Sequence, residues 1–186
     1  MSTETHLKER LVAHLLEHAV RRGEFTLKSG RTSTWFIDAK QTACRPEAML
    51  LVGEAVLAAC PPDATAIGGL TMGADPIAFV TATYAAARGR ALKAFSVRKE
   101  PKDHGGGGRI AGALDAGDRV VVTEDATTRG TSLLEAARAV RDVGAEPVLL
   151  CALVDRGGTC AALAAAEGLA FCAIVTAEDL GFPFDG

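Results

Sequence analysis

The sequence lacks the features that mark several large classes of protein. No apolar run approaches the roughly 18 residues that a membrane-spanning helix needs, and the opening MSTETHLKER lacks the apolar core of a secretion signal. Basic residues are not in excess, because 20 lysines and arginines face 23 acids and leave a net charge of −3. We therefore expect neither a membrane protein nor a nucleic-acid-binding protein.

Cysteine is also scarce. The five cysteines are odd in number, far apart and without a Cys-x-x-Cys pair, namely Cys44, Cys60, Cys151, Cys160 and Cys172. That pattern is typical of reduced, mostly buried thiols and predicts a cytoplasmic protein. Hydrophobic residues make up 48% and charged residues 23% of the 186 residues. These values exclude a disordered chain and predict a single domain, residues 1–186, that is large enough to bury a core.

The chain is organised around one stretch, residues 119–135, which reads RVVVTEDATTRGTSLLE. Its three β-branched valines, residues 120–122, predict a strand that is buried on both faces. Glu124 and Asp125 are adjacent acids where that strand should end. Two carboxylates in this position suit sugar hydroxyls or a magnesium ion.

A small-residue turn and the start of a helix follow these acids. The turn, residues 126–131, is rich in hydroxyls, and Ser132 begins a segment with apolar residues at helical spacing. The first turn of a helix has free N–H groups and a partial positive charge, so the arrangement suits a phosphate. A plain structural turn stays open, since many α/β proteins continue a strand this way. A Walker A loop is excluded, because no lysine follows Gly130.

The N-terminal segment predicts an amphipathic helix over residues 3–22 that Gly23 ends. Within it, HLLEH at residues 14–18 matches a pattern of some zinc peptidases. Both histidines fall on the side that carries Arg10 and Arg21. A solvated face explains them, and no zinc site is expected here.

Residues 25–38 predict a β-hairpin, since two short β-prone runs flank a Ser-Gly turn. This segment carries the only tryptophan, Trp35, next to Phe36, and it also contains Lys28. One interpretation is a small packed hairpin. The other is a hood over a ligand, with the aromatic rings against a planar ring and Lys28 against an anion. The pattern does not choose between them.

Two later loops and one arginine could also contact a ligand. Residues 69–76 place two glycines at a strand–helix junction, which allows close approach to an anion. Residues 98–109, RKEPKDHGGGGR, carry four basic and two acidic residues and so a charge of +2. This loop is either a solvated segment or a mobile lid over a phosphate ester. Arg156 follows a predicted strand and could bind a carboxylate or pair with Asp155.

The predicted elements alternate along the chain. Strands are expected near residues 64–68, 92–97, 119–124, 147–154 and 169–175, and helices over residues 46–59, 77–88, from 132 onward and 159–167. This order predicts an α/β fold with a central parallel sheet, flanked by helices, and with sites at the carboxyl ends of the strands.

Three motifs resemble one known family. The stretch at residues 120–132 resembles the signature with which type I phosphoribosyltransferases bind phosphoribosyl pyrophosphate (PRPP). FTLKSGRTSTWFID resembles the N-terminal motif, and RKEPKDHGGGGRIAG the catalytic loop, of the orotate phosphoribosyltransferases. The resemblance implies a type I phosphoribosyltransferase fold with a small N-terminal hood, approximately residues 1–40, and a core of approximately residues 41–186.

The same resemblance implies a reaction and the residues that perform it. The 5-phosphoribosyl group of PRPP would pass to N1 of orotate, giving orotidine 5′-monophosphate and pyrophosphate in de novo pyrimidine (UMP) biosynthesis. Lys102, His104 and Asp125 are the implied catalytic residues. The implied PRPP-binding residues are Arg98, Lys99, Lys102, His104, Glu124, Asp125, Ala126, Thr127, Thr128, Arg129, Gly130, Thr131 and Ser132. The implied orotate-binding residues are Lys28, Trp35, Phe36, Thr128 and Arg156.

The resemblance also implies partners and a cofactor. Mg²⁺ would be held mainly through PRPP, with no firm protein ligand, and the protein would be a homodimer that shares its lids. Met72 stands where some family members carry a lysine for pyrophosphate, so backbone groups would have to replace that contact. Two alternatives remain open: a phosphoribosyltransferase for another base, or a PRPP-binding regulator on the same fold.

Overall fold

The computed structural model describes residues 3–26, 32–101 and 108–185. Its centre is a six-stranded sheet in the order β5-β4-β3-β6-β7-β8, in which only the pairing of β4 with β5 is antiparallel. The strands are β3 (Ala66–Leu70), β4 (Lys93–Val97), β5 (Ile110–Gly112), β6 (Arg119–Thr127), β7 (Glu146–Asp155) and β8 (Ala170–Thr176). The predicted α/β fold with a mostly parallel sheet is confirmed.

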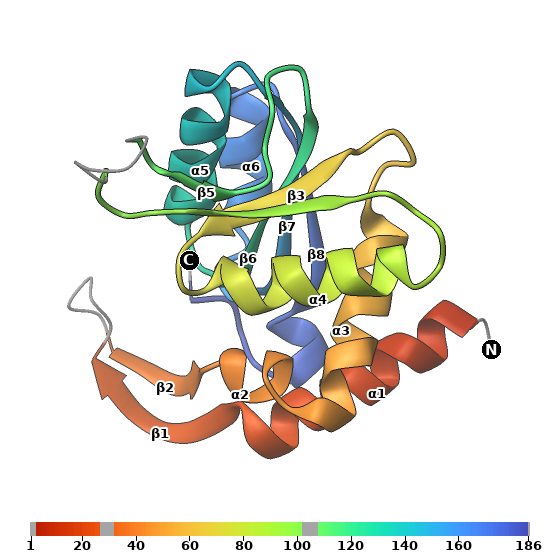
Figure 1. The fold of residues 1–186 in the computed structure, drawn as a ribbon. Coiled ribbons are helices and arrows are strands. Elements are labelled where there is room, and N and C mark those ends of the chain that lie inside the picture. The colour runs from red at the N-terminus through yellow and green to blue at the C-terminus, as the bar shows by residue number, and fades with distance from the viewer. Residues whose placement is uncertain (1–2, 27–31, 102–107, 186) are drawn as a thin grey trace.

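Helices cover both faces of this sheet (Figure 1). Successive valines of β6 explain why, because Val121 packs into one hydrophobic cluster whereas Val120 and Val122 pack into the other. A strand that is apolar on both faces needs cover on both. The first cluster lies under α3 (Pro46–Ala59) and α4 (Ala74–Ala86), and the second under α5 (Thr131–Asp142) and α6 (Cys160–Ala166). No helix within the described ranges is long and apolar enough to cross a membrane.

The direction in which the sheet is built reverses between β3 and β6. From β3 the chain continues outward to β4, whereas β6 pairs with the other side of β3 and leads to β7 and β8. In open α/β sheets, ligands bind in the crevice outside the carboxyl ends of the strands at such a reversal. The loops that follow β3 and β6 meet at this point.

The N-terminal segment lies across the same edge of the sheet (Figure 1). A two-stranded hairpin follows the first helix. A one-turn helix near the C-terminus leads the tail back to that hairpin. There Phe182 stacks on Trp35, with ring centroids 4.6 Å apart. The elements are α1 (Thr3–His18), β1 (Val20–Thr26), β2 (Thr32–Ile37), α2 (Lys40–Ala43) and η1 (Glu178–Leu180).

The first helix is shorter than its sequence predicted. It ends at His18 instead of residue 22, and Val20 begins a strand that pairs with Ile37 of β2. Hydrogen bonds across the hairpin therefore decide the conformation of residues 20–22, although their pattern is compatible with a helix. Gly23 does not end a helix; it lies in β1, where the pairing register shifts, with φ +151°.

The central strand is longer than predicted. It was expected to end at residue 124, but β6 continues to Thr127 because β7 runs alongside it, with Thr127 opposite Asp155. Glu124 and Asp125 therefore lie inside a strand, and the loop before α5 is shortened to residues 128–130. Strand β3 also begins two residues later than expected, and β5, α2 and η1 were not predicted at all.

Candidate active site

The acidic pair lies at the edge of the sheet where its order reverses. Glu124 and Asp125 are each 7% exposed. The Asp125 carboxylate accepts a hydrogen bond from the Ala126 N–H at 2.9 Å. Burial, and then the neighbouring Asp125 carboxyl, raises the pKa of Glu124 to about 9. At neutral pH the Glu124 carboxyl therefore carries a proton.

Lys40 of α2 reaches this pair, and the sequence did not single it out. Its ammonium lies 2.8 Å from Asp125 Oδ2 and 2.9 Å from Asp38 Oδ1. Burial alone would lower the pKa of Lys40, but the hydrogen bonds to Asp125 and Asp38 outweigh it and raise that pKa. In the sequence, Lys40 could be noticed only through an Asp-x-Lys pattern directly after a strand. That pattern is too common to identify a binding site.

The loop after β6 forms an open helix N-terminus. Thr127 Oγ1 accepts a hydrogen bond from the Gly130 N–H at 2.9 Å, which fixes the turn. Gly130 precedes α5 with φ +77°, and no described side chain caps this helix. Thr131 is exposed and Ser132 half-buried, so their hydroxyls remain accessible beside the first N–H groups. Free N–H groups and the helix dipole suit an anion at this position.

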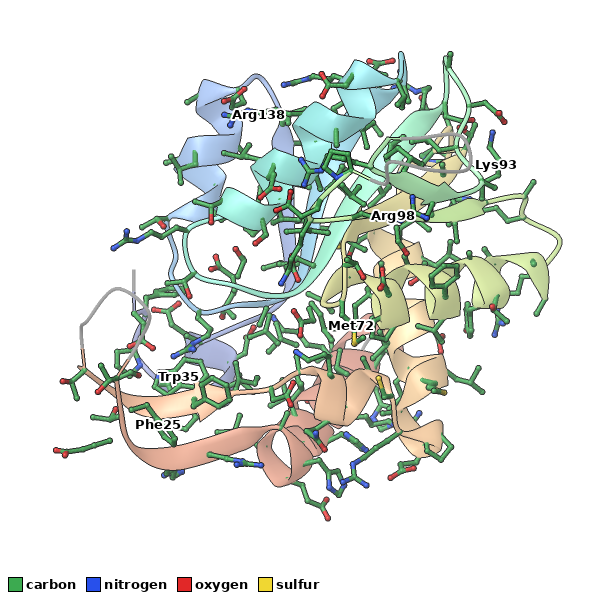
Figure 2. All side chains as sticks on the ribbon, turned by 60° about the vertical axis from the view of Figure 1, so that its left-hand side comes forward. Phe25, Trp35, Met72, Lys93, Arg98 and Arg138 are labelled. Atoms are coloured by element: carbon green, nitrogen blue, oxygen red, sulfur yellow. The ribbon has the colours of Figure 1, made fainter. Side chains whose placement is uncertain are left out.

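The loop after β3 brings its backbone against the acids. A Cβ atom on Gly73 would collide with the carboxylates of Glu124 and Asp125, so any larger residue would displace the acids. Met72 is 70% exposed and lies between the sheet and the N-terminal elements (Figure 2). The backbone of this loop therefore lies directly against the acidic pair.

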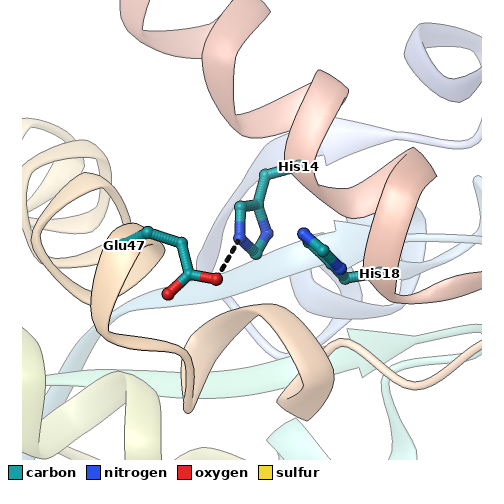
Figure 3. Close-up of side chains that lie close together, drawn as sticks. All are labelled: His14, His18 and Glu47. Atoms are coloured by element: carbon teal, nitrogen blue, oxygen red, sulfur yellow. Dashed lines mark ion pairs between the residues drawn. The ribbon is translucent and has the colours of Figure 1, made fainter.

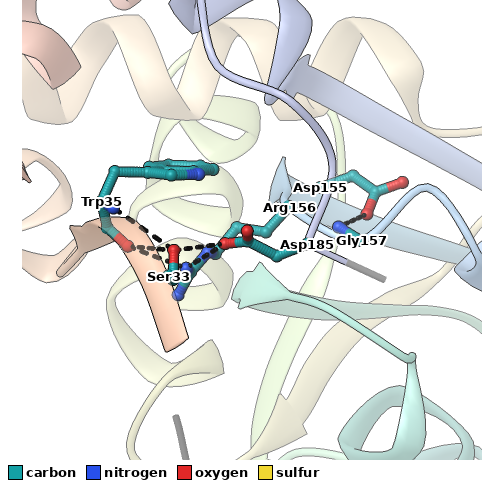
Figure 4. Close-up of polar contacts among 6 residues, drawn as sticks. All are labelled: Ser33, Trp35, Asp155, Arg156, Gly157 and Asp185. Atoms are coloured by element: carbon teal, nitrogen blue, oxygen red, sulfur yellow. Dashed lines mark hydrogen bonds and ion pairs between the residues drawn. The ribbon is translucent and has the colours of Figure 1, made fainter. Parts of the chain in front are cut away.

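Arg156 is buried at the end of β7, where it joins the tail to the hairpin (Figure 4). Its Nη2 donates to Asp185 Oδ2 at 2.6 Å and to the Trp35 carbonyl at 3.2 Å, and its guanidinium lies 4.6 Å from the centroid of the Trp35 ring. The alternative pairing with Asp155 is not formed; Asp155 instead accepts the Gly157 N–H at 3.0 Å. The C-terminal tail, which the sequence analysis passed over, supplies the acid that positions Arg156.

The two aromatic residues of the hairpin do not line one pocket. Trp35 is fully buried between Phe182 and Arg156, whereas Phe36 is 38% exposed and its ring lies 5.7 Å from that of Phe25. Successive side chains of a strand point to opposite faces, so adjacent residues cannot both face one ligand. Trp35 supports Arg156 from below, and Phe36 belongs to the other face of the hairpin.

The base of the predicted lid is closed by contacts between its two ends. The Arg98 N–H donates to the Arg109 carbonyl at 2.7 Å, and Arg109 Nε donates to the Arg98 carbonyl at 2.8 Å. Arg109 also forms an ion pair with Glu135 of α5, and Lys99 is exposed. Three of the predicted site residues lie outside the described residues, namely Lys28, Lys102 and His104.

Comparisons with known proteins agree with this geometry. No protein-family model matches the chain. The orotate phosphoribosyltransferase of Streptomyces coelicolor is 43% identical over 153 residues, which cover 82% of this chain and 84% of that one. The Corynebacterium glutamicum enzyme of that name is 39% identical over 181 residues, 97% of each chain.

A solved structure gives the same result. The orotate phosphoribosyltransferase of Mycobacterium tuberculosis in complex with PRPP matches with a TM-score of 0.80 and 35% identity, and the match covers 95% of this chain and 99% of that one. Identity at this level over nearly the whole length shows common descent, and the resemblance of the three sequence motifs is thereby confirmed. The chain belongs to the orotate phosphoribosyltransferase family.

Proposed function

We propose that the chain transfers the 5-phosphoribosyl group of PRPP to N1 of orotate, in de novo pyrimidine biosynthesis. One observation carries the assignment: the buried acids, the uncapped N-terminus of α5 and the buried Arg156 all lie at the same edge of the sheet. Orotate is already an anion, so the reaction needs no activated serine or cysteine. It needs sites for two anions and for a sugar between them.

PRPP occupies the edge formed by β6 and α5. The loop from Ala126 to Ser132 holds the 5′-phosphate through N–H groups and hydroxyls, with Arg129 exposed beside it. Glu124 and Asp125 hold the ribose hydroxyls. The protonated Glu124 can donate as well as accept a hydrogen bond, whereas Asp125 forms an ion pair with Lys40.

Orotate lies between this edge and the hairpin. Arg156 contacts its polar edge with the N–H groups that Asp185 and the Trp35 carbonyl do not occupy, and Thr128 and Lys28 complete the polar contacts. Trp35 acts through Arg156 instead of touching the base. Phe36 has no part in this pocket, because it occupies the outer face of the hairpin.

The lid residues Arg98, Lys99, Lys102 and His104 close over the pyrophosphate group, with Lys102 and His104 on the moving part. They stabilise the charge that develops as pyrophosphate departs, and closure excludes water that would hydrolyse PRPP. Mg²⁺ would supply further charge neutralisation on the pyrophosphate oxygens. It is held mainly through PRPP, since Glu124 carries a proton and Asp125 is already paired with Lys40.

Two further proposals concern the whole protein. The first is a two-fold homodimer in which each lid closes over the partner's site. The second is a cytoplasmic location, which the state of the five cysteines supports, since all of them are free thiols in the structure.

The test is a comparison of bases. The protein is mixed with PRPP and Mg²⁺, and with orotate, uracil, adenine or hypoxanthine in separate reactions, while pyrophosphate release and orotate absorbance are followed. We expect both signals with orotate alone. Pyrophosphate release with a purine would establish the other-base alternative, and PRPP binding without consumption of any base would establish a regulator.

A further inference from the structure

Two histidines and a glutamate from the N-terminal helices form a cluster (Figure 3). His14 and His18 lie one turn apart on α1, and Glu47 lies in the first turn of α3. One ligand atom from each can be chosen so that all three lie within 4.8 Å of one another. His14 is not on a solvated face as the sequence suggested, because only 11% of its side chain is exposed.

The hydrogen bonding of His14 leaves one ring nitrogen for a cation. Its Nδ1 lies 3.1 Å from the buried Thr42 hydroxyl. In the tautomer that donates from Nδ1 to Thr42, Nε2 carries the lone pair. That Nε2 is buried, has no hydrogen-bond partner among the described residues, and lies 3.8 Å from Glu47 Oε1. An unprotonated nitrogen and a carboxylate facing each other are two acceptors without a donor.

The contact with Thr42 also fixes the orientation of the His14 ring, so that Nε2 faces Glu47. A metal-binding histidine commonly donates its other ring N–H to an outer partner, as His14 can to Thr42.

We propose that His14, His18 and Glu47 bind one divalent transition-metal ion, Zn²⁺ in the first instance, which links α1 to α3. Two imidazoles and a carboxylate are a ligand set that zinc accepts, with water as the fourth ligand. Metal–ligand bonds of about 2.0–2.1 Å put neighbouring ligand atoms roughly 3.3 Å apart, so the His14–Glu47 pair has to close by about half an ångström. Mg²⁺ prefers an octahedron of oxygens and does not fit this set.

The charges around the cluster are nearly balanced. Arg45 lies close enough to lower the pKa of His14 and therefore opposes a cation. Glu17, whose Oε1 lies 3.7 Å from His18 Nε2, and Glu47 itself favour one. Apart from Glu47, which is itself a ligand, Arg45 and Glu17 offset each other, so binding depends on the three ligand atoms.

The test is a zinc titration of the metal-free full chain, in competition with a chromophoric chelator. The wild type should bind one zinc ion per chain. His18→Gln and Glu47→Gln should each weaken binding by about a hundredfold or more, since loss of an outer partner alone costs about 10- to 100-fold. Zinc should also raise the melting temperature of the wild type, but not of these variants, because only a ligand that binds the folded state stabilises it.

Two control variants separate this site from others. His6→Gln removes an exposed histidine of the same helix, and Cys44→Ser removes an exposed thiol that zinc could also bind. Both should bind zinc as the wild type does. The proposal is overturned if zinc does not bind in a saturable way, if Cys44→Ser abolishes binding, or if both glutamine variants keep full affinity.

Discussion

Glu124 and Asp125 are neighbours in β6, yet their carboxyls have different surroundings. Asp125 lies 2.8 Å from the Lys40 ammonium, whereas burial and the adjacent Asp125 raise the pKa of Glu124 to about 9. A pair of acids whose environments push their pKa values apart can hold one proton at neutral pH. The site thus offers one donor and one permanent acceptor to the hydroxyls of a sugar.

Glu124 should make the stability of the protein depend on pH. Its pKa is about 9 in the folded protein and near the ordinary glutamate value of 4.5 when unfolded, so the folded state holds a proton that the unfolded state loses. The stabilisation from this proton is complete below about pH 4.5 and is lost as the pH rises towards 9. Glu124→Gln cannot ionise. We expect its melting temperature, relative to that of the wild type, to rise steadily between pH 5 and pH 9.

The control for that experiment is Glu146→Gln, which changes an exposed acid at the other end of the sheet. Thermal unfolding of all three proteins is measured across the same pH range. A difference between Glu124→Gln and the wild type that stays constant with pH would show that Glu124 ionises normally.

Lys40 should matter for PRPP far more than for stability. Lys40→Met removes the charge that orients Asp125, and a hydrogen bond to a charged group contributes about 1.5–3 kcal/mol, so the KM for PRPP should rise about tenfold or more. Lys93→Met is the matched control, because Lys93 also bridges two acids, Asp115 and Asp118, but it starts β4 at the opposite end of the sheet. Steady-state kinetics of both variants decide the point. If Lys40→Met and Lys93→Met have equal KM values for PRPP, Lys40 has no role in PRPP binding.

At the scale of the elements, the turn before α5 requires a glycine for two separate reasons. Gly130 has φ +77°, and a Cβ atom there would collide with the sulfur of Cys160. Gly89 has φ +75° but no atom within 4 Å of such a Cβ. A side chain at either position would strain the left-handed backbone equally. Only at Gly130 would its Cβ atom also collide with a neighbouring side chain.

This contrast allows the anion site to be tested. Gly89→Ala and Gly130→Ala should each lose roughly 1–2 kcal/mol of unfolding free energy from the left-handed backbone. Gly130→Ala should in addition displace the turn and weaken PRPP binding by about tenfold, measured by calorimetry, whereas Gly89→Ala should bind normally. PRPP binding that is unchanged in Gly130→Ala would argue that this turn does not hold the phosphate.

The type and order of most elements could be predicted from the sequence because their signals are local. Continuous apolar runs, separated by small-residue turns and by segments with helical spacing, located the five parallel strands. The ends of α1 and β6 could not be predicted, because they are decided by pairing with distant partners, Ile37 for Val20 and Asp155 for Thr127.

The same limit applies to the site. Glu124 and Asp125 lie near the end of β6 and Arg156 directly follows β7, so the edge of the sheet that they occupy was foreseeable. Lys40 contacts Asp125 across 85 residues of sequence, and Asp185 contacts Arg156 across 29, so no local pattern could reveal either. The alternation of β2 was visible in the sequence and should have separated Trp35 from Phe36.

At the scale of the whole molecule, the proposed dimer can be tested through its lids. Lys102→Ala should reduce turnover by about two orders of magnitude, the scale of one lost transition-state contact. The Lys102→Ala and Asp125→Asn proteins are unfolded, mixed in equal amounts and refolded together. If lids act on the partner's site, a mixed dimer has one intact site, and activity should return to roughly a quarter of wild type when chains pair randomly. Activity that stays at the background of the parents, in mixed dimers confirmed by mass, would contradict shared lids.

The central claim is that orotate is the base and that Arg156 holds it. The most direct measurement is the initial rate of orotate consumption with PRPP and Mg²⁺, for the wild type, Arg156→Lys and the surface control Arg138→Lys, with each substrate varied in turn. The single ammonium of a lysine cannot keep the bonds to Asp185 and the Trp35 carbonyl and also contact orotate as the planar guanidinium can, so Arg156→Lys should raise the KM for orotate by about tenfold or more and leave that for PRPP nearly unchanged. Arg138→Lys should behave as the wild type. No consumption of orotate by the wild type, or a rise in the PRPP KM alone, would contradict the account.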